Sequence, residues 1–250
     1  MKKVLAIHDI STIGKASLTV VIPILSAMGL RVCPLPTMVL SSITGEGRKP
    51  VTLDLTEFMR QTAASMNEEF DWVYSGFLGS SEQTEIVAEL AAKGKNVLID
   101  PVMGDNGQLY STMNVDMVRG MKKLIKHADI ITPNWTEARF LTDEKFNNAG
   151  DIAKALEVER VVITSVPNKS GDCVDIAVCE QNHFEVISGD YAGEYSGAGD
   201  TFASVLLGKI SQGAAFGDSV RAAAEFVRLA ANVGEPQLGI EKVLDKLKNL

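Results

Sequence analysis

The stretch "WVYSGFLGSSEQTEIVAELAAKG" (residues 72–94) contains the unit from which the fold is built, a short apolar strand followed by an amphipathic helix. Its first six residues are aliphatic, aromatic or small, as in a buried strand. Beyond them, Ile86, Leu90 and the alanines between them share one helical face, and the pattern ends near Gly94. The stretch therefore predicts a βα unit.

The same alternation recurs along the chain. Apolar runs occupy residues 3–7, 31–40, 72–77, 96–101, 128–134 and 160–166. Several precede segments with helical spacing, which predicts right-handed crossovers and a largely parallel sheet covered on both faces. Residues 173–188 break the rhythm and predict a hairpin at one sheet edge. Helical patterns then follow at residues 198–213, 216–234 and 239–250. We expect one three-layer α/β/α domain over residues 1–250.

Composition narrows the classes of function. The chain has 250 residues, of which 46% are hydrophobic and 22% charged, as in ordinary globular proteins. Its net charge of −8, without a Lys/Arg run, argues against nucleic acid and anionic membranes as partners. No apolar run reaches the ~20 residues of a membrane helix, and "MKKVLAIHDIS" is too soon polar for a signal peptide. Cys33, Cys173 and Cys179 form no CxxC pair, which favours free thiols in a cytoplasmic protein.

A second stretch, "YSGAGDTFASVLLG" (residues 195–208), places an acid after two glycines where an apolar helix begins. Asp200 could simply favour the positive end of that helix, with Gly197 and Gly199 supplying a turn. Alternatively, the amides of Gly197, Ala198 and Gly199 hold a phosphate while Asp200 takes a proton from the group being phosphorylated. This stretch alone leaves both interpretations open.

Ligands of parallel sheets gather at the carboxyl ends of the strands, so the residues after each apolar run are informative. The residues found there, all polar or small except Phe77, are His8, Asp9, Ser11, Ser41, Ser42, Thr44, Gly76, Phe77, Asp100, Thr132, Asn134, Thr164 and Ser165. In "LIDPVMGDNGQLY" (residues 98–110), Asp100 ends a strand at a proline. It either satisfies nearby amides in a polar turn or lies near a hydrated Mg²⁺ ion, which prefers carboxylate oxygen.

In "ADIITPNWTEARFL" (residues 128–141), Asn134 and Glu137 lie one turn apart and share a face of the first helical turn. Helix capping by Asn134 or Thr132 explains this spacing as well as a ligand site does. The two interpretations are compatible, because a capping residue can also line a site.

Together, "DPVMGDNGQLY", "ITPNWTEA", "VVITS" and "GAGDTFAS" occur in an order and spacing that resembles the pyridoxal kinase branch of the ribokinase superfamily. The amino-terminal "AIHDIS" and residues 23–45 are similar to that branch too, so the resemblance covers nearly the whole chain. It implies a ribokinase-like, Rossmann-type α/β/α sandwich and transfer of the γ-phosphoryl group of ATP to the 5′-hydroxymethyl group of pyridoxal, pyridoxine or pyridoxamine. It also implies a homodimer. The chain has no GxxxxGK[ST] motif, which argues against a P-loop mechanism.

The resemblance also implies residue roles. Asp200 matches the catalytic base, and Gly197, Ala198 and Gly199 match the anion hole. Residues implied on the nucleotide side are Asp100, Tyr110, Thr132, Asn134, Glu137, Thr164 and Ser165. Mg²⁺ near Asp100 and Glu137 is implied, and so is a monovalent cation, K⁺ or Na⁺.

At the vitamin pocket, where Asp9, Ser11, Thr44, Phe77 and Asp200 are expected, the chain departs from well-known relatives. Asp9 stands where a serine is common, Ile43 replaces a histidine, and Phe77 replaces a tyrosine. Asp9 either pairs with a pyridinium nitrogen or an amine of the vitamer, or forms a local cap or an ion pair with His8. A hydroxymethylpyrimidine kinase is the nearest alternative. A non-catalytic nucleotide- or vitamin-binding module is another, although a binder does not need the base.

Overall fold

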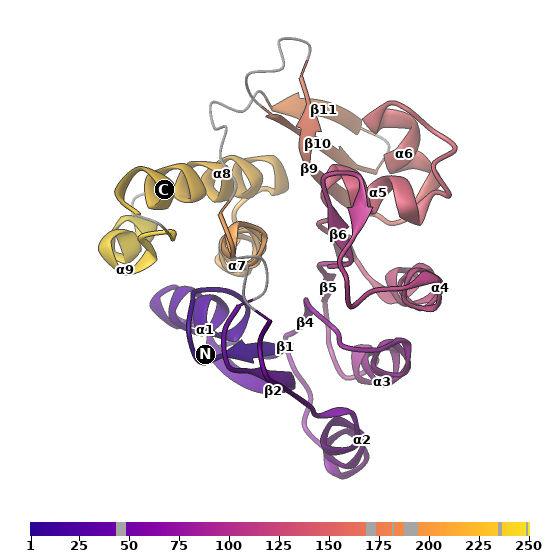
Figure 1. Ribbon diagram of the computed structural model, residues 1–250. Coiled ribbons are helices and arrows are strands. Elements are labelled where there is room, and N and C mark those ends of the chain that lie inside the picture. The colour runs from indigo at the N-terminus through magenta and orange to yellow at the C-terminus, as the bar shows by residue number, and fades with distance from the viewer. Residues whose placement is uncertain (44–48, 169–173, 182, 188–194, 235–236, 249) are drawn as a thin grey trace.

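A nine-stranded sheet runs through the computed structural model, which describes residues 1–43, 49–168, 174–181, 183–187, 195–234, 237–248 and 250 (Figure 1). The strand order is β11-β10-β9-β8-β5-β4-β1-β2-β3. Its strands are β1 (Lys3–Ser11), β2 (Arg31–Leu40), β3 (Thr52–Asp54), β4 (Trp72–Ser75), β5 (Val97–Ile99), β8 (Ile130–Ile131), β9 (Arg160–Pro167), β10 (Val174–Glu180) and β11 (His183–Ile187). The strands from β2 to β9 in this order pair in parallel, and β3, β10 and β11 add antiparallel pairs at the two edges. The predicted parallel sheet and the edge hairpin are confirmed.

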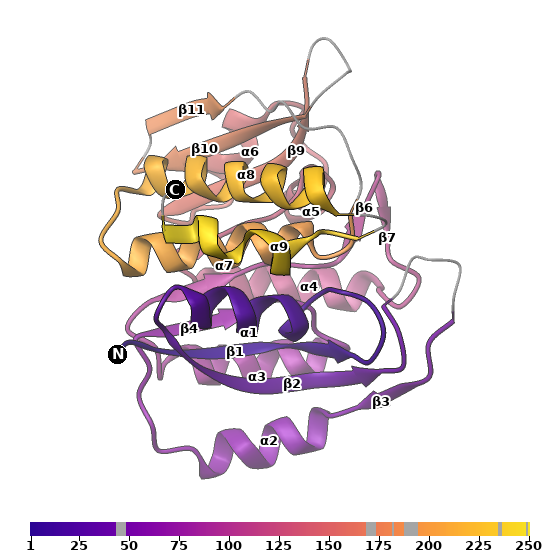
Figure 2. The same cartoon turned by 90° about the vertical axis from the view of Figure 1, so that its left-hand side faces the viewer.

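Helices cover both faces of this sheet. Helices α1, α7, α8 and α9 form one layer, which faces the viewer in Figure 2, and α2 to α6 form the other. The helices are α1 (Leu18–Ala27), α2 (Thr56–Ser65), α3 (Ser81–Ala91), α4 (Val115–Leu124), α5 (Trp135–Leu141), α6 (Ala149–Ala155), α7 (Ala198–Ser211), α8 (Phe216–Val233) and α9 (Ile240–Val243), with 3-10 turns η1 (Ile125–His127) and η2 (Leu244–Lys248). The predicted three-layer arrangement is confirmed.

The alternating side chains of β1 connect the sequence pattern to this layering. Val4 and Ala6 enter the core beneath α1, α7 and α8, whereas Leu5 and Ile7 enter the core beneath α2 to α6. All four are at most 1% exposed. Successive residues of a strand point to opposite faces, so a strand covered on both sides must be apolar throughout. Burial of each large aliphatic side chain contributes roughly 1.5–3 kcal/mol.

Helix α7 is buried along nearly its whole length. Every residue from Thr201 to Ser211 except Ile210 is buried. Small residues permit close packing here, since a Cβ on Gly208 would overlap the side chain of Met28. The first turn of α7 is therefore held by a helix that is fixed on all sides.

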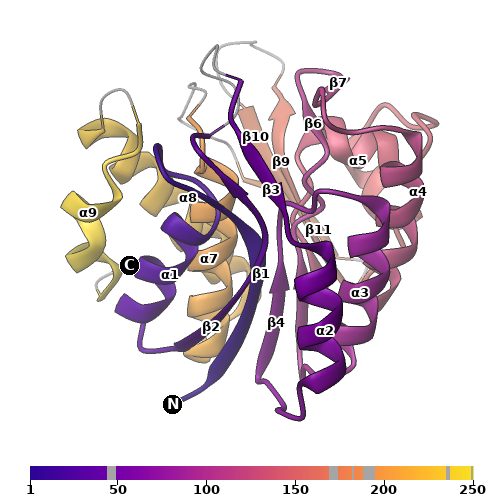
Figure 3. The same cartoon turned by 60° about the horizontal axis from the view of Figure 1, so that its bottom comes forward.

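The chain reverses its direction across the sheet at β1. From β1 it runs outward to β2 and β3, and it then returns to β4 on the other side of β1. Ligands of open α/β sheets bind in the crevice at such a reversal, outside the carboxyl ends of the strands. In Figure 3 this end of the sheet lies opposite the N-terminus, beside the hairpin of β6 (Gly104–Asp105) and β7 (Gln108–Leu109).

Several elements were not expected from the sequence. They are β3, α2, α4 and the small hairpin formed by β6 and β7. The hairpin turn contains Asn106 and Gly107, both with positive φ, which is the usual requirement of a tight two-residue turn. None of the helices in the described ranges combines the length and the apolar character that crossing a membrane requires.

Candidate active site

The first turn of α7 forms the centre of the site. Gly197 is the N-cap, with φ of 80°, and Asp200 lies in the first turn. A Cβ on Gly197 would lie 2.6 Å from the carbonyl oxygen of Lys15, so both the backbone conformation and the close approach require glycine. A Cβ on Gly199 would meet Asp100 Oδ2 at 3.6 Å, and Gly199 is exposed. Of the three predicted anion-hole amides, that of Ala198 donates to the carbonyl of Tyr195 at 3.1 Å.

The carboxylate of Asp200 is held from the other side by the β1–α1 segment. Its Oδ2 accepts a hydrogen bond of 2.8 Å from the backbone N–H of Ser17. Its Oδ1 lies 3.5 Å from Nδ1 of His8, and the Asp200 side chain is 12% exposed. His8 lies at the strand end where its sequence position predicts it, but its contact with Asp200 was not predicted, and neither was that of Ser17. No local pattern identifies either contact, because each joins segments more than 180 residues apart.

Asp9 is linked to this carboxylate through Ser17. The Ser17 hydroxyl donates to Asp9 Oδ1, and Asp9 is 6% exposed. Ser17 adopts φ of 53°, which is unusual for a residue other than glycine. Asp9 was expected either to bind the vitamer or to form a local cap or ion pair. The structure contains a local hydrogen bond, and its donor is Ser17. Burial raises the pKa of Asp9 to about 6, opposed by the Ser17 hydrogen bond and assisted by the negative charge of Asp200.

Because the pKa of Asp9 is raised, the free energy of unfolding should depend on pH. A buried acid with a raised pKa favours folding while it is protonated, so its contribution is complete below the ordinary value of 3.8 and is lost as pH rises to about 6. Asp9→Asn removes the charge but keeps an acceptor for Ser17. We therefore expect the free energy of unfolding of this variant, relative to wild type, to increase between pH 4.5 and pH 7.5 by on the order of 2 kcal/mol.

Urea denaturation of the unliganded proteins at several pH values measures this difference. Asp116→Asn, which removes an exposed carboxylate on α4, serves as the control for general charge effects. A difference between Asp9→Asn and wild type that stays constant across the pH range would contradict the prediction.

A second acidic cluster lies at the ends of β5 and β8. Asp100 is 5% exposed, and its Oδ1 accepts a hydrogen bond of 3.0 Å from the Thr132 hydroxyl. Glu137 is 3% exposed and accepts backbone N–H bonds from Met103 at 2.9 Å and from Asn134 at 2.8 Å. Burial raises the pKa of Asp100 well above its ordinary value, and the charges of Glu137 and Asp200 raise it further. Burial also raises the pKa of Glu137 to about 8, against its backbone hydrogen bonds.

Asn134 is the N-cap of α5 and forms a reciprocal capping box with Glu137. Its side-chain amide also donates to the Gly104 carbonyl at 2.8 Å. The predicted cap is therefore confirmed, and it ties α5 to the β6–β7 hairpin. The backbone of Asn134 pairs with that of Thr164, so Thr164 adjoins the same cluster.

The two remaining residues predicted on the nucleotide side are more exposed. Tyr110 is 41% exposed, and its backbone N–H donates to the Met103 carbonyl at 2.9 Å. Ser165 is exposed, with φ of 55°.

On the predicted acceptor side, Ser11 is buried at the end of β1, and Phe77 is partly buried after β4. The Phe77 carbonyl accepts a hydrogen bond from the Thr37 hydroxyl at 3.0 Å. Ile43, one of the departures, is 4% exposed and packs so closely on Gly14 that a Cβ there would lie 2.7 Å from it. Thr44 lies outside the described residues.

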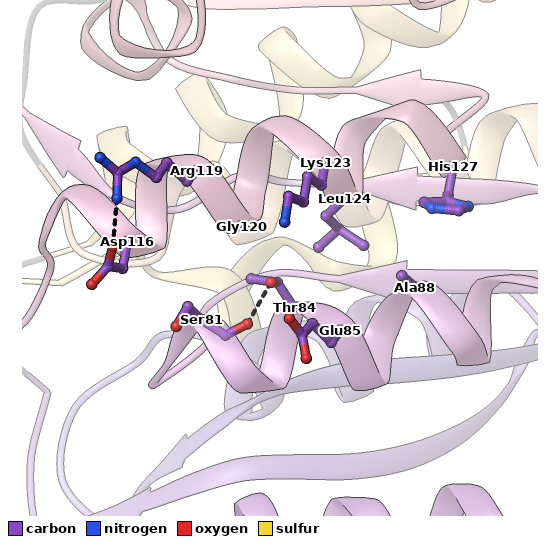
Figure 4. A pocket seen from close by; sticks show the side chains of 10 residues that line it. All are labelled: Ser81, Thr84, Glu85, Ala88, Asp116, Arg119, Gly120, Lys123, Leu124 and His127. Atoms are coloured by element: carbon purple, nitrogen blue, oxygen red, sulfur yellow. Dashed lines mark hydrogen bonds and ion pairs between the residues drawn. The ribbon is translucent and has the colours of Figure 1, made fainter.

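A groove of about 430 Å³ lies elsewhere, between α3 and α4 (Figure 4). Its lining includes Thr84, Arg119, Lys123 and His127, and it contains none of the predicted site residues. Thr84 of α3 and Gly120 of α4 both line this groove and lie in close contact. The groove is therefore explained as a gap between two packed helices. The crevice at the carboxyl ends of the strands therefore remains the candidate active site.

Comparison with known proteins identifies the family. A model of the phosphomethylpyrimidine kinases matches residues 22–243. The chain belongs to this kinase family. Among curated relatives of this kinase, the pyridoxal kinase of Dictyostelium discoideum is 32% identical over 216 residues, which are 74% of this chain and 70% of that protein.

Solved structures agree with this assignment. A Bacteroides thetaiotaomicron protein assigned to the phosphomethylpyrimidine kinases, in a crystal form with pyridoxal, is 36% identical to this kinase, with a TM-score of 0.93 over 99% of this chain and 96% of that one. Pyridoxal kinase from Lactobacillus plantarum is 28% identical, with a TM-score of 0.91 over 100% and 97% of the two chains. The ribokinase-like fold and the resemblance to pyridoxal kinases are confirmed.

Proposed function

We propose that this kinase transfers the γ-phosphoryl group of ATP to the 5′-hydroxymethyl group of a B6 vitamer: pyridoxal, pyridoxamine or pyridoxine. Its relatives include pyridoxal kinases, and one similar structure contains pyridoxal. The observation that carries the proposal is the Asp200 carboxylate, fixed by Ser17 in the first turn of α7 directly after left-handed Gly197. A mere binding module has no need of a carboxylate at that point.

In the proposed reaction, Asp200 accepts the proton of the vitamer hydroxyl while the hydroxyl oxygen forms a bond to the γ-phosphorus. The bond from that phosphorus to the β,γ-bridging oxygen breaks, and ADP leaves. Phosphoryl transfer requires chiefly alignment and neutralisation of charge. Backbone amides at Gly197, Ala198 and Gly199, together with the positive end of α7, supply fixed dipoles toward the moving phosphoryl group.

The acidic cluster fits a Mg²⁺ ion. Among the described residues no group of three His, Cys, Asp or Glu side chains is arranged to hold a metal ion. Mg²⁺ at phosphate-transfer sites needs only one or two carboxylates, because water and phosphate oxygens complete its shell. Asp100 and Glu137 would hold it, since burial raises the pKa of both and a cation relieves that penalty. Bound Mg²⁺ would neutralise charge on the phosphate oxygens.

The remaining assignments are part of the same proposal. Tyr110, Thr132, Asn134, Thr164 and Ser165 line the nucleotide side. Asp9, Ser11, Thr44 and Phe77 line the acceptor side, where Asp9 meets the pyridinium nitrogen or an amine. A monovalent cation, K⁺ or Na⁺, assists nucleotide binding.

A coupled ADP-release assay tests the function directly. The acceptors are pyridoxal, pyridoxamine, pyridoxine and hydroxymethylpyrimidine, each with ATP and Mg²⁺. We expect ADP release with at least one B6 vitamer to exceed that with the pyrimidine. The opposite order would assign the chain to the hydroxymethylpyrimidine kinases, and no release with any acceptor would identify a binding module.

A homodimer is supported by an exposed apolar patch on the β2–β3 edge, formed by Val39, Val51 and Leu53. These residues are 36%, 78% and 61% exposed, and Val39 lies directly opposite Leu53. An apolar edge strand is a natural surface for a second copy of the chain.

We expect wild type to sediment as a dimer and Leu53→Asp to sediment as a monomer. Val186→Asp, at the opposite edge, is the matched control. A monomeric wild type would exclude the dimer.

Two further expectations belong to this proposal. A single kinase domain over residues 1–250 is supported by the continuous sheet from β1 to β11. A cytoplasmic location is supported by free thiols at Cys33 and Cys179, and Cys173 lies outside the described residues. Limited proteolysis and subcellular fractionation test these two expectations.

A further inference from the structure

His8 is a fully buried imidazole at the point where the chain reverses across the sheet. It is 0% exposed, and within the described part of the chain neither ring nitrogen has a hydrogen-bond partner. Burying a polar ring without a hydrogen-bond partner is unfavourable. An aliphatic side chain would fill the same space without that penalty, so the imidazole calls for an explanation.

The surroundings fix the position of this ring. Gly76, which follows β4, leaves the space that the ring occupies, because a Cβ on Gly76 would overlap Nδ1 and Cε1 of His8. On another side the ring meets Tyr74 edge-on, with centroids 4.3 Å apart and an interplanar angle of 78°. Contacts with Gly76 and Tyr74 therefore hold the imidazole in one orientation.

That orientation directs Nδ1 toward Asp200. The distance from Nδ1 to Asp200 Oδ1 is 3.5 Å, and the other oxygen of the same carboxylate accepts the N–H of Ser17. A polar contact of this length becomes a hydrogen bond with a shift of about 0.5 Å. Hydrogen bonds at active sites are often long in unliganded structures and shorten when the substrate binds.

We propose that His8 is a positioning residue for Asp200. Its Nδ1 carries a proton and donates a hydrogen bond to Oδ1, while the N–H of Ser17 holds Oδ2, so the carboxylate cannot rotate away from the acceptor hydroxyl. This inference rests on the proposed kinase activity. His8 itself is 0% exposed and therefore offers no surface to ATP or the vitamer.

Two variants separate this role from simple packing. His8→Asn keeps an N–H donor near the position of Nδ1 but leaves space unfilled, whereas His8→Leu fills the space and has no donor. For a positioning role, His8→Leu should lower kcat by roughly 10- to 100-fold with KM for ATP nearly unchanged, and His8→Asn should restore most of the loss. For a packing role the order is reversed, with His8→Leu the more active. That reversed order would overturn the proposal.

A spectroscopic measurement decides the matter even if wild type phosphorylates no B6 vitamer. Long-range ¹H–¹⁵N spectra of histidine-labelled protein reveal which ring nitrogen carries the proton, and His127 and His183, both exposed, provide internal references. The signals missing from His8→Asn belong to His8. We expect Nδ1 to be protonated in wild type and its ¹⁵N shift to change in Asp200→Ala. An unprotonated Nδ1 overturns the inference independently of turnover.

Discussion

Asp200→Asn is expected to lower kcat by about 10²- to 10⁴-fold while binding of ATP is retained, because a general base contributes that much to proton transfer. Asparagine keeps an oxygen that can accept the N–H of Ser17, so the side chain should stay in place. What it loses is the ability to take a proton from the acceptor hydroxyl. Steady-state kinetics give kcat, and calorimetry with a nonhydrolysable ATP analogue gives the affinity.

Asp218→Asn is the matched control. Asp218 occupies the first turn of α8 as Asp200 occupies the first turn of α7, so both acids interact favourably with the positive end of a helix. If Asp200 served only the helix, the two variants would lose similar, small amounts of stability and keep their turnover. Near-wild-type kcat in Asp200→Asn would remove this residue from the proposed chemistry.

Gly197→Ala is expected to have a comparable effect, with a loss of about 10²-fold or more in kcat, since even a 1 Å displacement at a reacting centre can have this consequence. The new Cβ would lie 2.6 Å from the Lys15 carbonyl, which is backbone and cannot move aside easily. The first turn of α7 must then shift away from the β1–α1 segment. Asp200 and these amides would then be displaced together, away from the acceptor side at the end of β1 and from the acidic cluster at the ends of β5 and β8.

Gly213→Ala separates this effect from backbone strain. Gly213 also has a positive φ, of 94°, and a Cβ there would meet no atom within 4 Å. Left-handed backbone costs a non-glycine residue roughly 1–2 kcal/mol, so both variants should lose similar stability from that source. Turnover should fall in Gly197→Ala alone. Equal kcat values for the two variants would refute the close-approach argument.

Local sequence patterns predicted the layers and the parallel sheet because the alternation of strands and helices depends on the residue pattern within short segments. The run at residues 72–77 became β4, and the helical spacing after it became α3. The spacing of Asn134 and Glu137 likewise predicted the capping box. Short or mostly exposed elements carry a weaker signal, which is why the three residues of β3, all exposed, and helix α2 were not foreseen.

The contacts around Asp200 were beyond local patterns for a different reason. Asp200 contacts Ser17 and His8, which are more than 180 residues away along the chain, and such long-range pairs have no spacing that a sequence window can detect. The positive φ of Ser17 was also unpredictable, because a serine in the sequence does not indicate a positive φ as a glycine does. The role of Asp200 was predicted from the resemblance to a kinase family. The residues that hold its carboxylate, Ser17 and His8, are evident only in the folded structure.

Helix α7 carries the proposed base and the proposed phosphate-binding amides within four consecutive residues, and its remaining length is locked in the core. A small thermal motion of this helix therefore moves the proposed proton acceptor and the proposed phosphate-binding amides together, in the same direction and by the same distance. The distance between the two groups is therefore insensitive to small motions of α7 relative to the sheet, whereas their distances to groups on the strands are not.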